Sequence, residues 1–170
     1  MKLFKNITLL LFMSLAVVGC NKSDDDGGDD PQVTTGTFTA SVDGNSFTGI
    51  QGTVVAQSSS GNMAISGGTS ASENLQMIII GFDGVGTYPL NFTNIGTYSY
   101  LPDPNNPDPT TVVVYTTVGD AMGNNGEVNV SSFDGNIIKG TFSFEAFNLD
   151  NMSDTVSVTN GQFEIEVTQQ

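Results

Sequence analysis

The chain has 170 residues, of which 38% are hydrophobic, so it is long enough for one domain with a buried core. Its 18 acidic residues outnumber its 4 basic residues and leave a net charge of −14, which offers no basic surface to nucleic acid. The single cysteine excludes an internal disulfide, and the absence of histidine, arginine and tryptophan removes the groups most used in acid–base catalysis and phosphate binding. We therefore expect no enzyme activity, no cofactor and no nucleic-acid partner.

The first twenty residues have the pattern of a processing signal. Lys2 and Lys5 form a basic start, and an apolar run extends from Ile7 to Val18. This run is shorter than the roughly 20 apolar residues that a membrane-spanning helix needs. It ends close to the only cysteine, Cys20, and the pattern predicts that residues 1–19 are cleaved off. An ordinary secretory signal with an incidental cysteine is the alternative.

The residues Val17-Val18-Gly19-Cys20 resemble the lipobox of bacterial lipoproteins. This resemblance implies that the Cys20 sulfur receives a diacylglycerol, that the peptide is cut before Cys20, and that the new amino group is acylated. Two or more acyl chains, such as palmitate, hold a protein stably on a membrane where a single chain is marginal. We therefore expect a lipid anchor on a membrane that the chain does not cross.

An acidic block follows directly, at Ser23, Asp24, Asp25 and Asp26. It resembles the export signal of surface lipoproteins in the Bacteroidota, which directs the protein to the outer leaflet of the outer membrane. Because an outer bacterial surface is itself anionic, such a block acts as an address read by a receptor and not through attraction to lipid. The alternative is a periplasm-facing lipoprotein in which the charges only solvate the chain. In both cases residues 20–36 are predicted to form a flexible acidic tether.

From residue 37 to residue 170 the hydrophobic pattern has a period of two, which is typical of half-buried β-strands. In residues 37–43 (TFTASVD), apolar and polar side chains alternate, and Asp43-Gly44-Asn45 follows as a turn. The other candidate strands are residues 53–57, 62–66, 97–101, 111–117, 127–133, 140–148, 155–159 and 161–167. Thr, Ser, Gln and Glu occupy the opposite positions, as expected when one face of an antiparallel sheet meets water. Glycines between the strands, including Gly67-Gly68, are expected at turns.

Residues 75–82 (LQMIIIGF) depart from this alternation, because six of the eight are apolar. Such a run predicts a strand that is covered on both faces. In total, about ten short strands separated by glycine turns predict a single all-β domain over residues 37–170. It is either an antiparallel β-sandwich or a closed barrel-like domain, and the strand spacing does not choose between them.

Several segments together resemble a family of Bacteroidota lipoproteins known only as a domain of unknown function. They are FTASVDGNSF at residues 38–47, KGTFSFEAFN at residues 139–148 and VTNGQF at residues 158–163. The resemblance covers about residues 37–167 and implies a small all-β domain on a lipoprotein, with no catalytic residues carried over. One departure is Phe47, which stands where relatives are expected to have tryptophan.

The segment LPDPNNPDP at residues 101–109 contains four of the six prolines. They are Pro102, Pro104, Pro107 and Pro109. We expect an extended, solvent-facing loop whose stiffness lowers the entropy lost on binding, so it is a candidate contact loop for a glycan or a protein. Tyr98 and Tyr100 directly precede it, Tyr88 and Tyr115 lie nearby in sequence, and tyrosine rings can stack on sugars. A rigid connector beside tyrosines that pack in the core is the alternative.

Three weaker sequence patterns suggest further functional sites. Asp154-Thr155-Val156 is similar to the acceptor of O-glycosylation in the Bacteroidota and implies a sugar on Thr155, although so short a pattern also arises by chance. Glu164 and Glu166 share one strand face at a separation that suits a glycosidase, but such pairs more often serve solubility. Aspartates in turns, such as Asp43 and Asp134, could converge on a structural calcium ion, although each is first a turn former.

These patterns favour a lipid-anchored protein of the outer membrane, exposed on the cell surface, that acts as a non-catalytic binding module for a glycan or a protein. A glycan hydrolase that uses only carboxylates and a purely structural component of the cell envelope are the alternatives.

Overall fold

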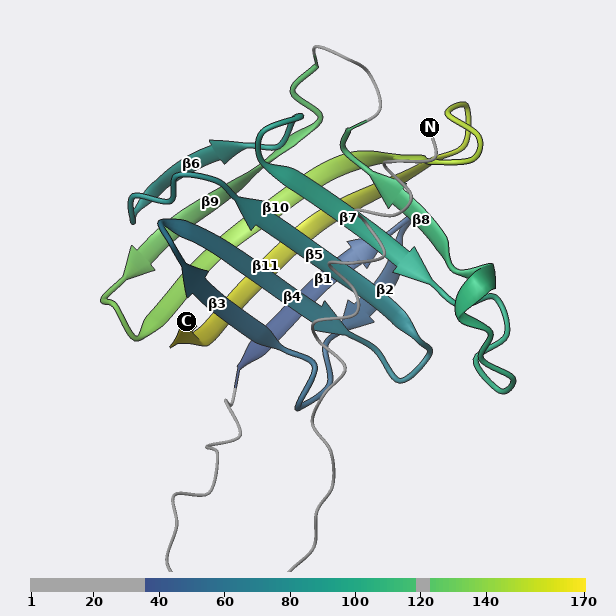
Figure 1. The fold of residues 1–170 in the computed structure, drawn as a ribbon, viewed down its shortest axis with the longest axis horizontal. Coiled ribbons are helices and arrows are strands. Elements are labelled where there is room, and N and C mark those ends of the chain that lie inside the picture. The colour runs from purple at the N-terminus through teal and green to yellow at the C-terminus, as the bar shows by residue number, and fades with distance from the viewer. Residues whose placement is uncertain (1–35, 119–122) are drawn as a thin grey trace, which may run out of the picture. The chain divides into compact units, whose positions relative to one another are not determined.

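All strands of the structure, a computed structural model that describes residues 36–118 and 123–170, belong to one sheet (Figure 1). The predicted signal peptide, Cys20 and the acidic block at residues 23–26 lie outside the described residues. The eleven strands and one 3-10 helix are β1 (Thr37–Val42), β2 (Asn45–Thr48), β3 (Val55–Ser59), β4 (Asn62–Gly68), β5 (Glu73–Ile79), β6 (Gly86–Pro89), β7 (Ile95–Tyr100), η1 (Pro109–Thr111), β8 (Val113–Thr116), β9 (Gly126–Phe133), β10 (Ile137–Asn148) and β11 (Thr155–Gln169). The all-β prediction is therefore confirmed. Among the described residues, no helix is long and apolar enough to cross a membrane.

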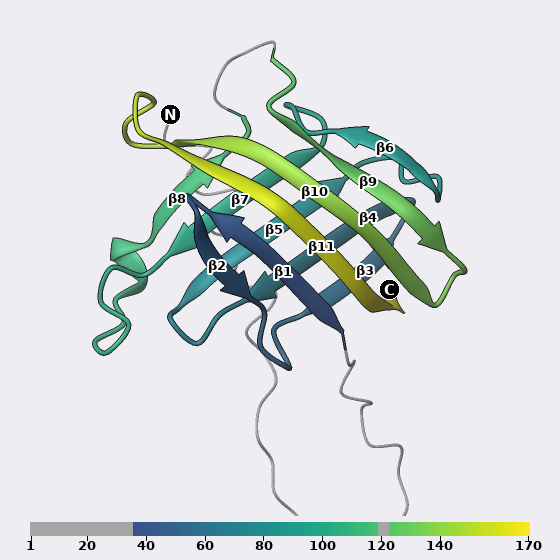
Figure 2. The same cartoon turned by 180° about the vertical axis from the view of Figure 1, so that it is seen from behind.

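The strands form two layers that face each other. The order in the sheet is β2-β1-β11-β3-β4-β5-β7-β8-β10-β9-β6, and an additional pairing between β11 and β10 closes a ring of seven strands. One layer contains β3, β4, β5, β7 and β8, and the other contains β2, β1, β11, β10, β9 and β6. Figures 1 and 2 show the strands of the two layers crossing each other. The arrangement is a sandwich whose two sheets are joined at their corners.

The two corner pairings are the shortest pairings between the described strands. At one corner β8 pairs with β10 through only two residue pairs, Phe147 with Thr116 and Asn148 with Tyr115. At the other corner β11 pairs with β3 over Val167–Gln169, and this pairing is parallel, whereas all other pairings are antiparallel. The predicted antiparallel pairing therefore holds throughout the described sheet except at this one corner.

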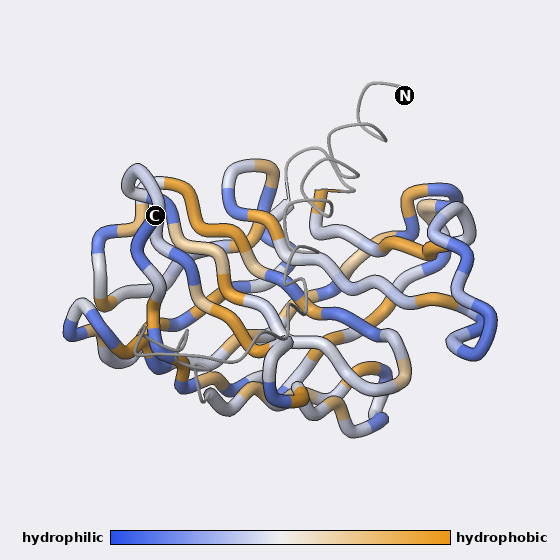
Figure 3. Tube along the Cα trace, turned by 60° about the horizontal axis from the view of Figure 1, so that its bottom comes forward, coloured by the Kyte–Doolittle hydropathy of each residue, from blue (hydrophilic) through white to orange (hydrophobic). Residues whose placement is uncertain are grey.

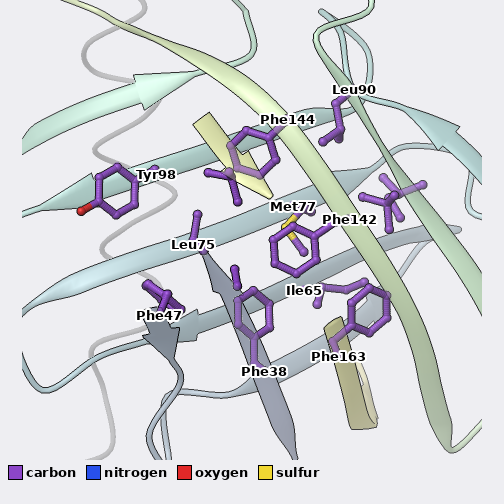
Figure 4. Close-up of a cluster of buried hydrophobic side chains, with 14 of the residues drawn as sticks. Phe38, Phe47, Ile65, Leu75, Met77, Leu90, Tyr98, Phe142, Phe144 and Phe163 are labelled. Atoms are coloured by element: carbon purple, nitrogen blue, oxygen red, sulfur yellow. The ribbon is translucent and has the colours of Figure 1, made fainter. Parts of the chain in front are cut away.

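The alternation predicted from the sequence places one face of each strand inside the sandwich. Figure 4 shows the phenylalanines of β1, β2, β10 and β11 packed against aliphatic side chains of β4 and β5. The labelled side chains of this core are Phe38, Phe47, Ile65, Leu75, Met77, Leu90, Tyr98, Phe142, Phe144 and Phe163. The hydropathy alternates along the strands, and both hydrophilic and hydrophobic residues occur in the loops between them (Figure 3). Each large buried side chain contributes about 1.5–3 kcal/mol to the stability of the fold.

Glycines and phenylalanines face each other at the centre of β10 and β11. Gly140 is the register partner of Phe163, and Gly161 is the register partner of Phe142. A Cβ atom on Gly140 would lie 2.6 Å from Cζ of Phe163, and one on Gly161 would lie 2.6 Å from the ring of Phe142. The aromatic rings therefore occupy the space that a side chain at either glycine would need. This reciprocal pairing explains why the GTF and NGQF segments carry both residue types.

The structure corrects four expectations about individual strands. Gly67-Gly68 was expected at a turn but ends β4, where a Cβ on Gly67 would lie 2.7 Å from the ring of Phe38. Residues 155–159 and 161–167 form one strand, β11, interrupted only by a bulge near Asn160. The short strands β2 and β6 were not predicted. The apolar strand β5 is fully buried on its inner face alone, since Gln76 and Ile78 on its other face are only half-buried, and Ile80, just after the strand, is 48% exposed.

Candidate binding surfaces

Two of the tyrosines near the proline-rich loop line one end of the sandwich interior. Tyr98 on β7 and Tyr115 on β8 are only 7% and 8% exposed, and their ring centroids lie 6.0 Å apart. The Tyr98 hydroxyl donates a hydrogen bond to Oε1 of Glu73 at 2.8 Å, and the Tyr115 hydroxyl donates one to Oδ2 of Asp154 at 2.9 Å. Both hydroxyls thus have carboxylate partners, and both rings lie largely out of reach of a ligand.

Burial and these hydrogen bonds favour the neutral form of both phenols. Burial, followed by the hydrogen bond to Glu73, raises the pKa of Tyr98 well above its ordinary value. Burial, followed by the hydrogen bond to Asp154, raises the pKa of Tyr115 to about 12. Neither tyrosine is therefore suited to act as a base near neutral pH.

The other two tyrosines differ in their surroundings. Tyr100 is half-buried at the end of β7, and its ring centroid is 5.9 Å from that of Tyr98. Tyr88 lies on β6, where its ring stacks on Phe82 at 5.6 Å and its hydroxyl donates to the carbonyl oxygen of Gly84. Three of the four tyrosines thus gather at the end of the sandwich next to the loop, and Tyr88 belongs to another part of the sheet.

The proline-rich loop connects β7 to β8 and is exposed along most of its length. Its predicted contact residues Pro102, Pro104, Pro107 and Pro109 are all exposed. The Asp103 carboxylate accepts hydrogen bonds from the backbone N–H groups of Asn105 and Asn106. Asp108 caps η1 by accepting from the N–H and the hydroxyl of Thr110, and these bonds lower the pKa of its carboxyl group. The loop is therefore held in shape by its own aspartates, which suits both a contact loop and a rigid connector.

Thr155, the predicted site of O-glycosylation, is exposed at the start of β11 and is the register partner of Phe147. The preceding Asp154 is held in place, because its Oδ2 accepts from Tyr115 and also from the Asn148 amide at 2.9 Å. Thr155 thus lies at a well-defined junction between a loop and a strand.

A row of uncharged polar side chains crosses the outer face of the layer that contains β10 and β11. Strand register places Asn129, Thr141, Gln162 and Thr39 directly opposite one another on β9, β10, β11 and β1. The pairing extends to Thr87 on β6 and to Thr48 on β2. All six side chains are exposed. We refer to Thr87, Asn129, Thr141, Gln162, Thr39 and Thr48 as the polar row; its layer faces the viewer in Figure 2.

The surface is hollowed along the middle of the polar row. Two adjoining open hollows, of about 420 and 370 Å³, share Thr141 and Gln162 in their walls. The first hollow extends toward Glu127 and Asn160, and the second extends toward Thr37 and Lys139. Sequence analysis identified none of the polar row as a site, because the only signal was that these residues are the outward members of alternating strands.

Charged residues lie on both sides of the polar row. On one side, Nζ of Lys139 forms an ion pair with Oε1 of Glu164 at 2.7 Å, with both side chains about half exposed. On the other side, Glu127 is exposed in the wall of the first hollow. Glu164, one of the two carboxylates with glycosidase-like spacing, is therefore engaged by a lysine on the neighbouring strand, and its partner Glu166 is half-buried.

The aspartates considered for calcium lie in turns, as the alternative interpretation of their sequences predicts. Oδ1 of Asp134 accepts from the backbone N–H groups of Asn136 and Ile137, and these bonds lower the pKa of its carboxyl group. Asp43 accepts from the N–H of Ser157. Over residues 36–118 and 123–170, no group of three or more Asp, Glu, His or Cys side chains is arranged to hold a metal ion.

Comparison with known proteins places the chain in a family but gives it no function. No curated protein matches the sequence. Residues 34–165 match the family described as Domain of unknown function (DUF6252), which covers all strands except the last residues of β11. The KGTFSFEAFN and VTNGQF segments and their reciprocal glycine–phenylalanine pairs both lie within this match. The chain therefore belongs to the DUF6252 family of domains of unknown function.

Proposed function

We propose that this protein is a surface-exposed, lipid-anchored binding module of the outer membrane that acts without catalysis or a cofactor and takes a glycan or a protein as ligand. The lipobox-like residues that end at Cys20 and the acidic block at residues 23–26 support the anchor and the surface location. The hollowed polar row supports the binding role.

The polar row is the observation that carries the binding role. Within the described residues, none of its six side chains forms a hydrogen bond to another protein group, although each can donate and accept. Structural polar side chains in this domain are satisfied internally, as the Asp43, Asn94 and Asp154 side chains show. A hollow lined by unpaired donors and acceptors on a rigid sheet is a surface prepared for a polar ligand.

The proline-rich loop is the second proposed contact surface. Its exposed prolines and its aspartate-stabilised turns keep it rigid, which limits the entropy cost of binding. Replacing residues 103–106 with glycine and serine should weaken ligand binding while leaving the melting temperature nearly unchanged. Unchanged affinity would identify the loop as a connector only.

The lipid anchor is tested most directly by labelling. Cells that express the full chain with radiolabelled palmitate should yield a labelled protein, and Cys20→Ser should abolish the label and release the protein from the membrane fraction. Because the chain has only one cysteine, any thioether-linked label reports on Cys20 alone. Absence of label on the natural chain would contradict the anchor.

Surface display is tested by changing the acidic block. Replacement of Ser23 to Asp26 by alanine should make the protein resistant to protease added to intact cells, because the protein then stays on the inner leaflet. The matched control replaces Asp29 and Asp30, which belong to the same tether. Equal loss of protease access in both variants would show that export depends on the charge of the tether and not on a specific signal at residues 23–26.

Thermal melts with a panel of ligands distinguish the binding role from the two alternatives, a glycan hydrolase and a purely structural envelope component. Full-length protein is melted with and without calcium, oligosaccharides and candidate envelope proteins, and a ligand at 100 times its Kd stabilises it by about 2.7 kcal/mol. Turnover of a saccharide that Glu164→Gln abolishes would favour the hydrolase. A flat panel without turnover would favour the purely structural role and overturn the proposal.

Glycosylation of Thr155 is a separate proposal that the exposed position of this residue supports. Mass spectrometry of protein from its natural host should show a sugar on the peptide that contains Thr155, and Thr155→Val should remove it. An unmodified peptide from the natural protein would contradict this proposal.

A further inference from the structure

We infer that the ligand of the polar row is an uncharged oligosaccharide that lies across the strands, from β6 toward β2, and is held by hydrogen bonds to Asn129, Thr141, Gln162 and Thr39. This inference rests on the proposed binding function and names its ligand class. The direction, the chemistry and the shape of the row each support it.

The direction of the ligand follows from strand register. The six side chains belong to six neighbouring strands and are direct register partners, so they form a line perpendicular to the strands. With neighbouring strands about 4.8 Å apart, the line is about 24 Å long. A ligand that uses the whole row must therefore be a chain of several units.

The class of the ligand follows from the side chains. Threonine hydroxyls and Asn or Gln amides both donate and accept hydrogen bonds and carry no charge, which matches the hydroxyl groups of neutral sugars. Lys139 is the only basic residue after Lys22, and it is already paired with Glu164. A sulfated, phosphorylated or uronate-rich glycan would therefore meet an anionic surface without a free cation to neutralise it.

A polypeptide fits this surface less well than a sugar chain. Protein interfaces depend on buried aromatic, arginine or aliphatic anchors. The outward side chains of the two hollows are instead Thr, Ser, Asn, Gln, Glu and Lys, and the two phenylalanines of their walls, Phe142 and Phe163, are buried in the core. The surface is thus rich in hydrogen-bonding groups and poor in anchors.

The hollow follows from irregularities in the strands that carry the row. The register shifts come from two extra residues. Strand β11 carries one near Asn160, opposite Thr39–Ser41 of β1 and Phe142–Phe144 of β10, and β9 carries one near Ser131, opposite Lys139–Gly140 of β10. Such bulges bend a strand and increase its twist. The bulges lie two residues from Gln162 and Asn129, and Asn160 and Ser131 line the two hollows, so the bends place the middle of the row in a depression where a chain can rest.

The experiment uses purified full-length protein in detergent. An array of uncharged and anionic glycans is screened first, and the best uncharged oligosaccharide is then titrated while backbone amide NMR shifts are followed. Because the site has no stacking aromatic ring, we expect weak binding, with a Kd on the order of 1 mM or below. Shifts should concentrate at residues 129, 141, 162 and 39, and the anionic glycans should not bind.

The variants remove hydrogen-bonding groups while keeping the shape of the side chains. Thr141→Val combined with Gln162→Leu should weaken binding at least tenfold. The matched control, Thr168→Val with Gln57→Leu, makes the same changes at the end of β11 and on β3, outside the two hollows, and should bind like the natural protein. Thermal melts confirm that both double variants are folded.

The outcomes separate this inference from the proposed function. Binding of a glycan or a protein that the row variants do not change overturns the inference and leaves the binding function standing. Binding of a protein that the row variants abolish likewise overturns the sugar assignment alone. Binding of an anionic glycan alone overturns the inference and leaves the binding function standing. If no glycan of either kind and no candidate protein binds, both the inference and the proposed function fail.

Discussion

Side chains fill the interior of the domain in two chemically different ways. At the centre of β10 and β11, phenylalanine rings lie directly on glycines, and the contact is one of shape alone. At the end that carries Tyr98 and Tyr115, aromatic rings also pack together, but each hydroxyl reaches a carboxylate near the surface. The centre has no room for one added carbon atom, whereas the tyrosine end depends on single polar interactions.

This difference predicts where the fold tolerates substitutions without a large loss of stability. A close-packed interior transmits strain, because its atoms have no free space to move into. A hydrogen bond near water can be replaced at a net cost of about 1 kcal/mol. We therefore expect large losses of stability from small changes at the glycine–phenylalanine centre and small losses at the tyrosine end.

The largest effect is expected from Gly140→Ala. The added methyl group would meet the backbone oxygen of Asn129 and the ring of Phe163, and the backbone oxygen cannot move without breaking the pairing of β9 and β10. Urea denaturation should show a loss of about 3 kcal/mol or more in the free energy of unfolding. The matched control is Gly86→Ala on β6, where the nearest atom to the new methyl is 3.9 Å away. Equal stabilities of the two variants would contradict the shape argument.

A double-mutant cycle tests whether Phe142 and Gly161 act as one unit. Gly161→Ala alone should cost about 1–3 kcal/mol because its methyl meets the Phe142 ring at 2.6 Å. After Phe142→Leu, which shortens that side chain, the same change should cost at least about 1 kcal/mol less. The control cycle combines Phe142→Leu with Gly86→Ala and should be additive. Additivity in both cycles would show that the ring and the glycine do not constrain each other.

A smaller effect is expected from Tyr98→Phe. This variant keeps the ring but removes the hydrogen bond to Glu73, whose other oxygen still accepts from the Thr69 hydroxyl at 3.0 Å. The expected loss is about 1–2 kcal/mol in the free energy of unfolding. Tyr100→Phe is the matched control, because within the described residues the Tyr100 hydroxyl forms no hydrogen bond. An equally large loss of stability for Tyr100→Phe would show that the effect of Tyr98→Phe does not come from the hydrogen bond to Glu73.

The sequence alone predicts most strands, because alternation is a local property. The strands with clear alternation, such as residues 37–42 and 126–133, are where the pattern places them. The strands β2 and β6 have only four residues each, and their sequences NSFT and GTYP contain too few positions to show a period. Gly67-Gly68 suggests a turn because glycine is a turn former in most contexts. Only the three-dimensional contact of Gly67 with the ring of Phe38 explains why a glycine is needed at that position of the strand.

The candidate sites are harder to predict, because they depend on which strands are neighbours. Tyr88 is close to Tyr98 in sequence, yet it lies on β6 in the other layer, where its ring stacks on Phe82. Thr39 and Gln162 are far apart in sequence, yet register makes them direct partners. Alternation shows that both point outward, but it does not show their alignment. The polar row therefore appears only once the pairing of all six strands is known.

The last effect, and the one specific to the tyrosine end, is a dependence of stability on alkaline pH. The pKa of Tyr115 is raised to about 12 in the folded protein, against about 10 in the unfolded chain, so the folded state retains its proton to higher pH. The extra stability is complete below pH 10 and is lost as the pH rises through 12. Urea denaturation at pH 9 and pH 12 should show a decrease of about 1–2 kcal/mol from Tyr115, and Tyr98, whose pKa is also raised, adds to the same decrease. Tyr115→Phe removes the titrating group, so its stability curve should be flatter over this range. If the curves of the variant and the natural protein run parallel from pH 9 to 12, burial and the carboxylate contact do not hold the proton on Tyr115, and the contrast between the centre and the tyrosine end loses its electrostatic half.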